Sequence, residues 1–171
     1  MAENEELGPV QIRRAVPADA AQIAAVLETI AAERIHSAID QAWTVEEEQR
    51  YLESLSAREG FNVAVDGAIG VVAFQSLDLW SPLGSMAHVG QIGTFVLPAW
   101  RGQGVGRRLW RATEAMARAA GFRKLIAQVR GSNHAAQVFY SHLGFRECGR
   151  LTGQVTIDDV EDDVVLMEFF F

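Results

Sequence analysis

Cysteine is almost absent from this chain of 171 residues, and long apolar runs are absent altogether. The one cysteine, Cys148, can form no disulfide within the chain. No stretch approaches the ~18 consecutive apolar residues that a membrane-spanning helix needs. Residues 1–6 are acidic and polar, unlike a secretory leader. We therefore expect a cytoplasmic protein that has no membrane partner.

Basic residues are also scarce, with 15 lysines and arginines against 22 acidic residues and a net charge of −7. A nucleic-acid partner is not expected, because phosphate backbones need basic surface. Many of the basic residues are nevertheless concentrated between Arg101 and Arg130. In an acidic chain such a local patch indicates a small anionic ligand, and a solvated helix face is the plainer alternative.

Residues that commonly hold metals or act as nucleophiles are few. The four histidines show no metal-binding spacing and cysteine pairs are absent, so no metal is expected. A nucleophilic Cys148 would form an acyl-enzyme, but it follows a Gly-Phe turn and is expected within a strand. The histidines are His36, His88, His134 and His142.

Strand and helix patterns alternate along the chain after residues 1–9, which we expect to form a loose tail. The order is typical of a single α/β domain over residues 10–171, with helices flanking a mixed, twisted sheet. The sequence predicts strands at residues 10–15, 61–65, 68–77, 88–97, 124–130, 145–155 and 164–170. It predicts helices at residues 17–34, 44–57, 104–120 and 132–143.

Short local signals mark the ends of these elements. Thr44-Val-Glu-Glu47 is a capping box that begins a helix. Asp66-Gly67 is a hairpin signal between two strands. Gly121 and Gly144 are expected to end helices. The acidic residues 158–163 are expected to form the turn between the last two strands.

A glycine-rich segment leads from the predicted strand that ends near Leu97 into a predicted helix. Glycine lets the backbone turn tightly and approach a ligand closely, and free N–H groups at a helix start carry partial positive charge. Together they indicate an anion site suited to phosphate groups. The segment contains Gly102, Gly104 and Gly106, flanked by Arg101 and Arg107.

Two other phosphate-binding motifs do not fit this segment. A P-loop would continue with Gly-Lys-Ser or Gly-Lys-Thr, which does not occur here. The dinucleotide fingerprint would need a glycine at the position of Leu109. A plain helix start with turn glycines is the structural alternative to a phosphate site.

The pattern Arg101-x-x-Gly104-x-Gly106 resembles the pyrophosphate-binding motif Arg/Gln-x-x-Gly-x-Gly/Ala of the GCN5-related N-acetyltransferases. The resemblance implies acetyl-CoA as cosubstrate, no metal, and splayed parallel strands at 88–97 and 124–130 that admit the cofactor. A backbone amide of the first strand would also polarise the thioester carbonyl. The implied cofactor-binding residues are Thr94, Phe95, Val96, Arg101, Gly102, Gln103, Gly104, Val105, Gly106, Arg107 and Asn133.

A second segment agrees with the resemblance. Asn133-x-x-Ala136-x-x-Phe139-Tyr140-x-x-x-Gly144-Phe145 is similar to a segment that follows the glycine loop in the same family. The resemblance implies that Asn133 contacts the cofactor and that Tyr140 protonates the leaving thiolate. Tyr140 is therefore the expected catalytic residue, with a packing role as the alternative, and Phe139 is expected in the core.

No residue is marked by the sequence as the base that deprotonates the acceptor amine. Many relatives place a glutamate on one of the two splayed strands, where this chain has Gln91 and Gln128. Glutamine cannot take a proton, so we expect deprotonation through water positioned by Gln91, or selection of the free amine. His88 is the alternative base. Gln128 also disfavours the branch that acetylates ribosomal-protein N-termini.

The expected function is transfer of an acetyl group from acetyl-CoA to a primary amine of a small molecule, by direct attack on the thioester. The alternatives are an acyl-CoA-binding sensor or inactive homologue, a protein N-terminal acetyltransferase, and a structural domain that binds no coenzyme A. Trp43 and Trp80 would line the acceptor pocket or serve in packing. A homodimer is left open.

Overall fold

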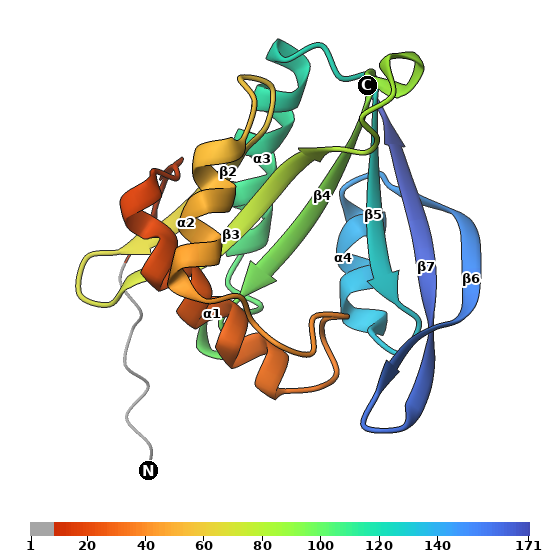
Figure 1. Cartoon of the computed structure of the whole chain (residues 1–171), viewed down its shortest axis with the longest axis horizontal. Helices are drawn as coiled ribbons and strands as arrows, with labels where there is room; N and C mark the ends of the chain where they lie inside the picture. Colours follow the sequence, from red (N-terminus) through yellow and green to blue (C-terminus); the bar gives the residue numbers. More distant parts are fainter. Residues whose placement is uncertain (1–8) are drawn as a thin grey trace.

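The computed structural model of the chain describes residues 9–171, so the expected tail lies outside the described part, apart from Pro9. Seven strands form one mixed sheet in the order β1-β2-β3-β4-β5-β7-β6, with helices packed on it (Figure 1). The predicted α/β class and the predicted order of strands and helices are confirmed. Within residues 9–171, no helix has the length and apolar character needed to cross a membrane.

The bounds of the elements are close to those expected. The strands are β1 (Gln11–Arg14), β2 (Gly60–Asp66), β3 (Gly70–Leu79), β4 (Val89–Val96), β5 (Lys124–Arg130), β6 (Arg146–Ile157) and β7 (Val160–Phe170). The main helices are α1 (Ala20–Ala32), α2 (Val45–Ser54), α3 (Val105–Ala119) and α4 (His134–His142). One-turn helices occur at η1 (Pro17–Asp19), η2 (Gly84–Met86) and η3 (Pro98–Trp100).

The two faces of the sheet are covered by different helices, because strand side chains alternate between faces. On β3, Phe74 packs in a core cluster with Ile23 of α1 and, more loosely, Tyr51 of α2. Leu77 belongs instead to a cluster that contains Trp110 of α3. The face under α1 and α2 is therefore distinct from the face under α3, and a residue's place along β3 decides which face it reaches.

The central parallel strands β4 and β5 pair over only part of their length. Their register covers four residue pairs, of which the last is Ile92 with Ala127. β4 nevertheless continues to Val96 and β5 to Arg130, each paired on its outer side with β3 or β7. The strands thus splay apart as predicted, and the backbone groups along their facing edges are left for another partner.

Short sequence signals predicted the local structure correctly where the residues of the signal contact one another. The Thr44 hydroxyl accepts the N–H of Glu47, and the Glu47 carboxylate accepts the N–H of Thr44, so the capping box is confirmed. The Asp66-Gly67 hairpin also forms, although its left-handed residue is Gly70, with φ of +93°. The Asp66 carboxylate stabilises this turn by accepting two backbone N–H groups.

The acidic turn predicted at residues 158–163 is wrong in extent. The turn consists of Asp158 and Asp159, both with positive φ, and β7 already begins at Val160. Asp162 lies within the strand because its carboxylate accepts a hydrogen bond of 2.8 Å from Nε of the buried Arg130. This partner comes from another strand, so a run of acidic residues was mistaken for a solvated turn.

We expect Gly90→Ala to destabilise the fold at the paired start of β4. A Cβ there would lie 2.8 Å from Leu125 Cδ2 and 3.1 Å from Leu77 Cδ1 in the packed core. The expected loss is about 1–3 kcal/mol of unfolding free energy, measured by urea titration. Gly67→Ala is the control, because its Cβ meets nothing within 4 Å, and it should change stability by less than about 0.5 kcal/mol. Equal stability of the two variants would contradict this account.

Candidate functional site

A cavity of about 360 Å³ lies where β4 and β5 part. Its walls come from the second half of β4, the glycine-rich segment and the start of α4, with His36 at one side. All but one of the eleven predicted cofactor-binding residues line it. The exception is Gln103, whose amide turns back onto the carbonyl oxygen of Ala99. Segments far apart in the sequence are thus brought to one cavity.

The glycine-rich segment presents open backbone to this cavity. Gly102 and Gly104 have φ of +73° and +77°, a left-handed conformation that strains other residues. A Cβ on either would meet nothing within 4 Å, so the space beside them is free. Gly104 is the N-cap of α3, whose first N–H groups have no partner within the helix. This geometry suits an anionic group at the helix start.

The Arg101 side chain has a structural partner rather than a free charge. Its guanidinium donates to both carboxylate oxygens of Glu33, at 2.8 and 2.6 Å, and its Nε donates to the carbonyl oxygen of Val96 at 2.9 Å. Hydrogen bonds from Arg101 lower the pKa of Glu33 and keep it ionised. Arg107 forms no ion pair with any residue of the described chain and is the better placed positive charge.

Residues 33–37, here called the strap, join the ends of the two splayed strands. At the β4 side the strap is held by the Glu33–Arg101 ion pair. At the β5 side Arg130 donates a hydrogen bond to the carbonyl oxygen of Arg34. Asn133 Nδ2 donates to the carbonyl oxygen of His36 at 2.9 Å, while its Oδ1 caps α4. The strap therefore spans the mouth of the gap.

Tyr140 is buried beside the cavity and reaches it through another residue. It is 4% exposed and packs in the core, and its hydroxyl lies 2.9 Å from Thr94 Oγ1, which lines the cavity. Gln75 Nε2 donates to the same Thr94 oxygen at 2.7 Å. Burial raises the pKa of Tyr140 to about 12, against the opposing effect of Thr94. Tyr140 is therefore protonated at neutral pH, as a proton donor must be.

Phe139 packs against the core, as expected, and is partly buried there. It also borders the cavity, where its ring would lie 3.0 Å from a Cβ on Gly106. Gly106 is thus the glycine at which α4 approaches α3. Phe139 therefore lines the cavity, while the adjacent Tyr140 is the more deeply buried of the two.

Gln91 and Gln128 meet where the strands part, with Gln128 Nε2 donating to Gln91 Oε1 at 3.3 Å. Neither His88 nor Cys148 lines the cavity. Loss of solvation and the nearby Glu168 raise the pKa of the Cys148 thiol, which weakens it as a nucleophile. Among residues 9–171, no group of three or more metal-ligating side chains is placed to hold an ion.

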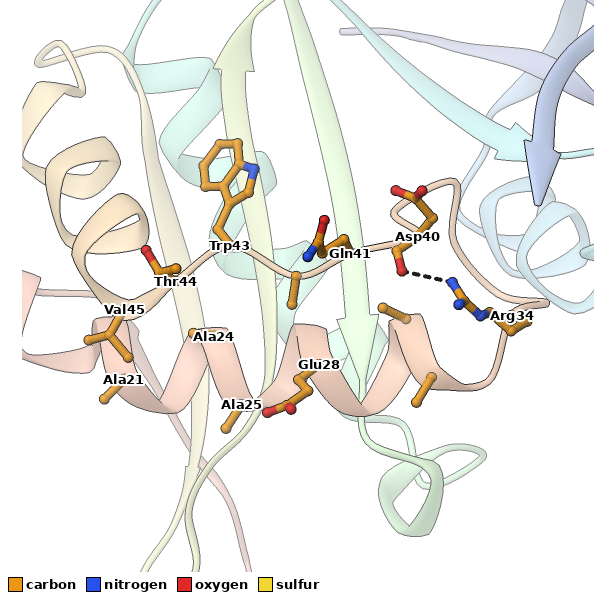
Figure 2. A pocket seen from close by; sticks show the side chains of 13 residues that line it. Ala21, Ala24, Ala25, Glu28, Arg34, Asp40, Gln41, Trp43, Thr44 and Val45 are labelled. Carbon is orange, nitrogen blue, oxygen red and sulfur yellow. Dashed lines mark hydrogen bonds between the residues drawn. The ribbon is translucent and has the colours of Figure 1, made fainter. Parts of the chain in front are cut away.

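A larger hollow of about 730 Å³ lies between α1 and the segment that leads to α2 (Figure 2). Alanines such as Ala21 and Ala25 form much of its wall, and it shares no residue with the glycine-rich segment. Figure 2 shows the Trp43 side chain pointing away from α1. The polar residues that line it, among them Glu28, Asp40 and Gln41, carry none of the motifs found in the sequence, so its volume alone marks no chemistry.

Comparisons with known proteins agree with the fold and the site geometry described above. The model of the acetyltransferase (GNAT) family matches residues 26–145. The chain belongs to this family. Its sequence is 29% identical, over 97 residues, to an L-methionine sulfoximine/L-methionine sulfone acetyltransferase of Pseudomonas aeruginosa. That match spans 56% of each chain, so the chain covers about half the length of this curated relative.

Solved GNAT structures share the fold over nearly the whole chain. A phosphinothricin acetyltransferase from Sinorhizobium meliloti, in complex with acetyl-CoA, has a TM-score of 0.88 at 18% identity, over 96% of this chain and 89% of its own. A ribosomal-protein-alanine N-acetyltransferase from Brucella melitensis has a TM-score of 0.85 at 24% identity, over 94% and 99%. At these sequence identities the similarity shows a shared fold and nothing about the substrate.

We expect Thr94→Val to destabilise this GNAT fold, because it leaves the Tyr140 hydroxyl and the Gln75 amide without their shared partner. Gln75 Oε1 already lacks a partner within the described residues. Burying these unpaired groups should cost about 1–3 kcal/mol of unfolding free energy in urea titrations. Thr94→Ser keeps the oxygen and should be the milder change. A valine variant as stable as the serine variant would show that the hydrogen bonds contribute nothing.

Proposed function

We propose that residues 10–171 form an acetyl-CoA-dependent N-acetyltransferase domain that acetylates a primary amine of a small molecule by direct attack. The observation that carries the proposal is the cavity at the splayed strands, which continues into the open glycine backbone at the start of α3. Membership of the GNAT family supports the same activity. The S. meliloti structure of the same fold, which contains acetyl-CoA, supports the choice of cosubstrate.

The cavity has groups that are complementary to the pyrophosphate, the pantetheine arm and the thioester of acetyl-CoA. The pyrophosphate would accept hydrogen bonds from the N–H groups at the start of α3, with Arg107 adding charge. The pantetheine arm is extended and amide-rich, and would pair with the free edge of β4 at Thr94 to Val96, where β5 has parted. A backbone N–H of this edge would stabilise the oxyanion that forms on the thioester carbonyl.

The chemical step needs a neutral amine and a protonated leaving group. The amine nitrogen bonds to the thioester carbon, and the C–S bond breaks as the tetrahedral intermediate collapses. Tyr140 would give its proton to the thiolate and regain one from the amide nitrogen. The Thr94 oxygen receives a hydrogen bond from Gln75, so its own hydrogen is free to point to the Tyr140 oxygen. This leaves the Tyr140 hydrogen free for the thiolate, which would have to approach past Thr94, since Tyr140 itself does not line the cavity.

A small-molecule acceptor is favoured by the Pseudomonas relative, whose name describes acetylation of amino-acid analogues. The B. melitensis structure makes protein N-terminal acetylation the second candidate, although Gln128 stands where that branch is expected to have a glutamate. A sensor that binds acetyl-CoA without turnover is the third. Coenzyme A release, followed with a thiol reagent for panels of small amines and of N-terminal peptides, separates the three.

We expect Gly104→Val to abolish acetyl-CoA binding in calorimetry while the protein stays folded, because the side chain would fill the space proposed for the pyrophosphate. Gly121→Val is a matched control at the other end of α3. Both glycines have φ of +77° and open space around them, so both variants carry the same backbone strain. Loss of binding in both variants, or in neither, would contradict the assignment. A wild type that binds no coenzyme A would overturn the proposed function itself.

We expect Tyr140→Phe to lower kcat by ~10²–10⁴-fold, the usual effect of losing a general acid. The affinity for acetyl-CoA should not change, because Tyr140 lies behind Thr94 rather than in the cavity wall. Steady-state kinetics and calorimetry measure the two quantities. An unchanged kcat would reduce Tyr140 to a packing residue of the core.

A further inference from the structure

A carboxylate lies directly beside Gln91, on the neighbouring strand. In the register of β3 with β4, Asp78 is opposite Gln91. Phe74 and Asp78 are four residues apart on a regular strand, so they point to the same face of the sheet, the face covered by α1 and α2. Asp78 thus stands next to the position where a catalytic glutamate was expected and not found, and no sequence motif indicates it.

Asp78 belongs to a group of acids that lacks a counter-ion. Burial raises the pKa of Asp78, and the hydroxyl groups of Tyr51 and Ser76 lower it. Glu48, on α2, is 1% exposed and its Oε1 has no hydrogen-bond partner. Burial, and then the charge of Asp78, raise the pKa of Glu48 to about 7. In residues 9–171, neither carboxylate forms an ion pair with lysine, arginine or histidine.

The other charged groups near Asp78 are already engaged. The Glu59 carboxylate accepts the backbone N–H groups of Leu79 and Ser56, which lower its pKa. Arg58 donates to two backbone carbonyl groups and lies over a phenylalanine ring. Two carboxyl groups in a poorly solvated place are unfavourable unless a cation joins them. The surroundings of Asp78 therefore lack one positive charge, which a ligand can supply.

An aromatic wall adjoins these carboxylates. Tyr51 donates its hydroxyl hydrogen to Asp78 Oδ1, and the ring of Trp43 meets the ring of Tyr51 edge-on, with centroids 5.1 Å apart. Trp43 is 46% exposed and points away from α1 in Figure 2. Trp43 is thus linked to Asp78 through the Tyr51 ring. An exposed aromatic ring that leads to a carboxylate is suited to an organic ammonium ion, whose apolar body packs on the ring.

We propose that Asp78, beside Tyr51 and Gln91, is the acceptor subsite, where it binds the ammonium group of a primary amine and takes its proton. This inference rests on the proposed acetyl transfer. The apolar part of the amine lies against Trp43. The acceptor differs in this from the amino-acid analogues named for the Pseudomonas relative: it carries no carboxylate next to its amino group, because such a group would face Asp78 and Glu48 with no free cation to offset the repulsion.

The proton balance of the reaction closes with this assignment. The ammonium ion gives one proton to Asp78 and becomes the neutral nucleophile. After attack, the nitrogen loses its second proton, which ends on the coenzyme A sulfur by way of Tyr140. Asp78 then releases its proton to solvent. The products are the amide, coenzyme A with a free thiol, and one proton.

The decisive experiment is the pH dependence of kcat/KM for Asp78→Asn in the full chain, with acetyl-CoA and phenethylamine. For the wild type, the rate should be constant between the pKa of Asp78 and that of the amine. The variant should be slower by ~10²–10⁴-fold at pH 7. Its rate should rise tenfold per pH unit, because only free amine from solution then reacts. Calorimetric affinity for acetyl-CoA should match that of the wild type.

Glu59→Gln is the matched control, since it removes a nearby negative charge while its amide oxygen can still accept the N–H of Leu79. The N–H of Ser56, which binds the other carboxylate oxygen, loses its partner in this variant. It should keep the wild-type rate on the plateau, while the acidic limb moves to slightly lower pH, because the charge of Glu59 contributes to the raised pKa of Asp78. Glu48→Gln should leave the acidic limb of the profile in place, because the charge of Asp78 raises the pKa of Glu48 to about 7 and Glu48 is still protonated while Asp78 ionises. A wild-type rate and profile in Asp78→Asn would overturn the proposal.

A comparison of substrates tests the same subsite without any variant. Phenethylamine and phenylalanine differ only in the carboxylate, and the wild type should acetylate the amine and not the amino acid. Equal kcat/KM for the two would overturn the proposed acceptor class. A wild type that binds acetyl-CoA but acetylates no amine or N-terminal peptide would instead overturn the acetyltransferase proposal, and the subsite with it.

Discussion

The site depends on the point where β4 and β5 stop pairing, after Ile92 and Ala127. Backbone N–H and C=O groups must find partners, and an open edge in the middle of a sheet is costly unless something fills it. Each strand keeps its outer neighbour, so the sheet survives the opening. The opening then leaves an unpaired edge of β4 beside the helix start of α3. The end of pairing between β4 and β5 thus creates two binding features: a free strand edge for an extended, amide-rich chain, and an adjoining helix start for an anion.

Two arginines near the gap hold the ends of its strands through ion pairs, so neither is left as a free positive charge for a ligand. Arg101 is held by Glu33 at the end of β4, and Arg130 is held by Asp162 at the end of β5. The basic residues whose clustering in the sequence predicted an anionic ligand therefore have two different roles. Part of it holds the strand ends, and Arg107 is left near the cavity to meet a ligand. The local electrostatics of the cavity depend on backbone dipoles more than on the count of arginines.

Sequence reasoning succeeded where a contact lies within a few residues and failed where it depends on another strand. The capping box at Thr44, the glycines before α3 and the order of elements are local signals. The extent of β7 was missed because Arg130 reaches Asp162 from β5. Asp78 was missed because its position beside Gln91 depends on the register of β3 with β4, which the sequence does not reveal. An aspartate between two leucines, in the segment Phe74-Gln-Ser-Leu-Asp-Leu79, was the one available signal.

The strap gives the two halves of the sheet a mechanical link where their hydrogen bonds end. Residues 33–37 hold the end of β4 through Glu33 and the end of β5 through Arg34, and the same segment continues to Trp43. A change in the separation of the strands must pull on this connection. A ligand that enters between the strands and a ligand that contacts Trp43 would therefore act on the same continuous length of backbone.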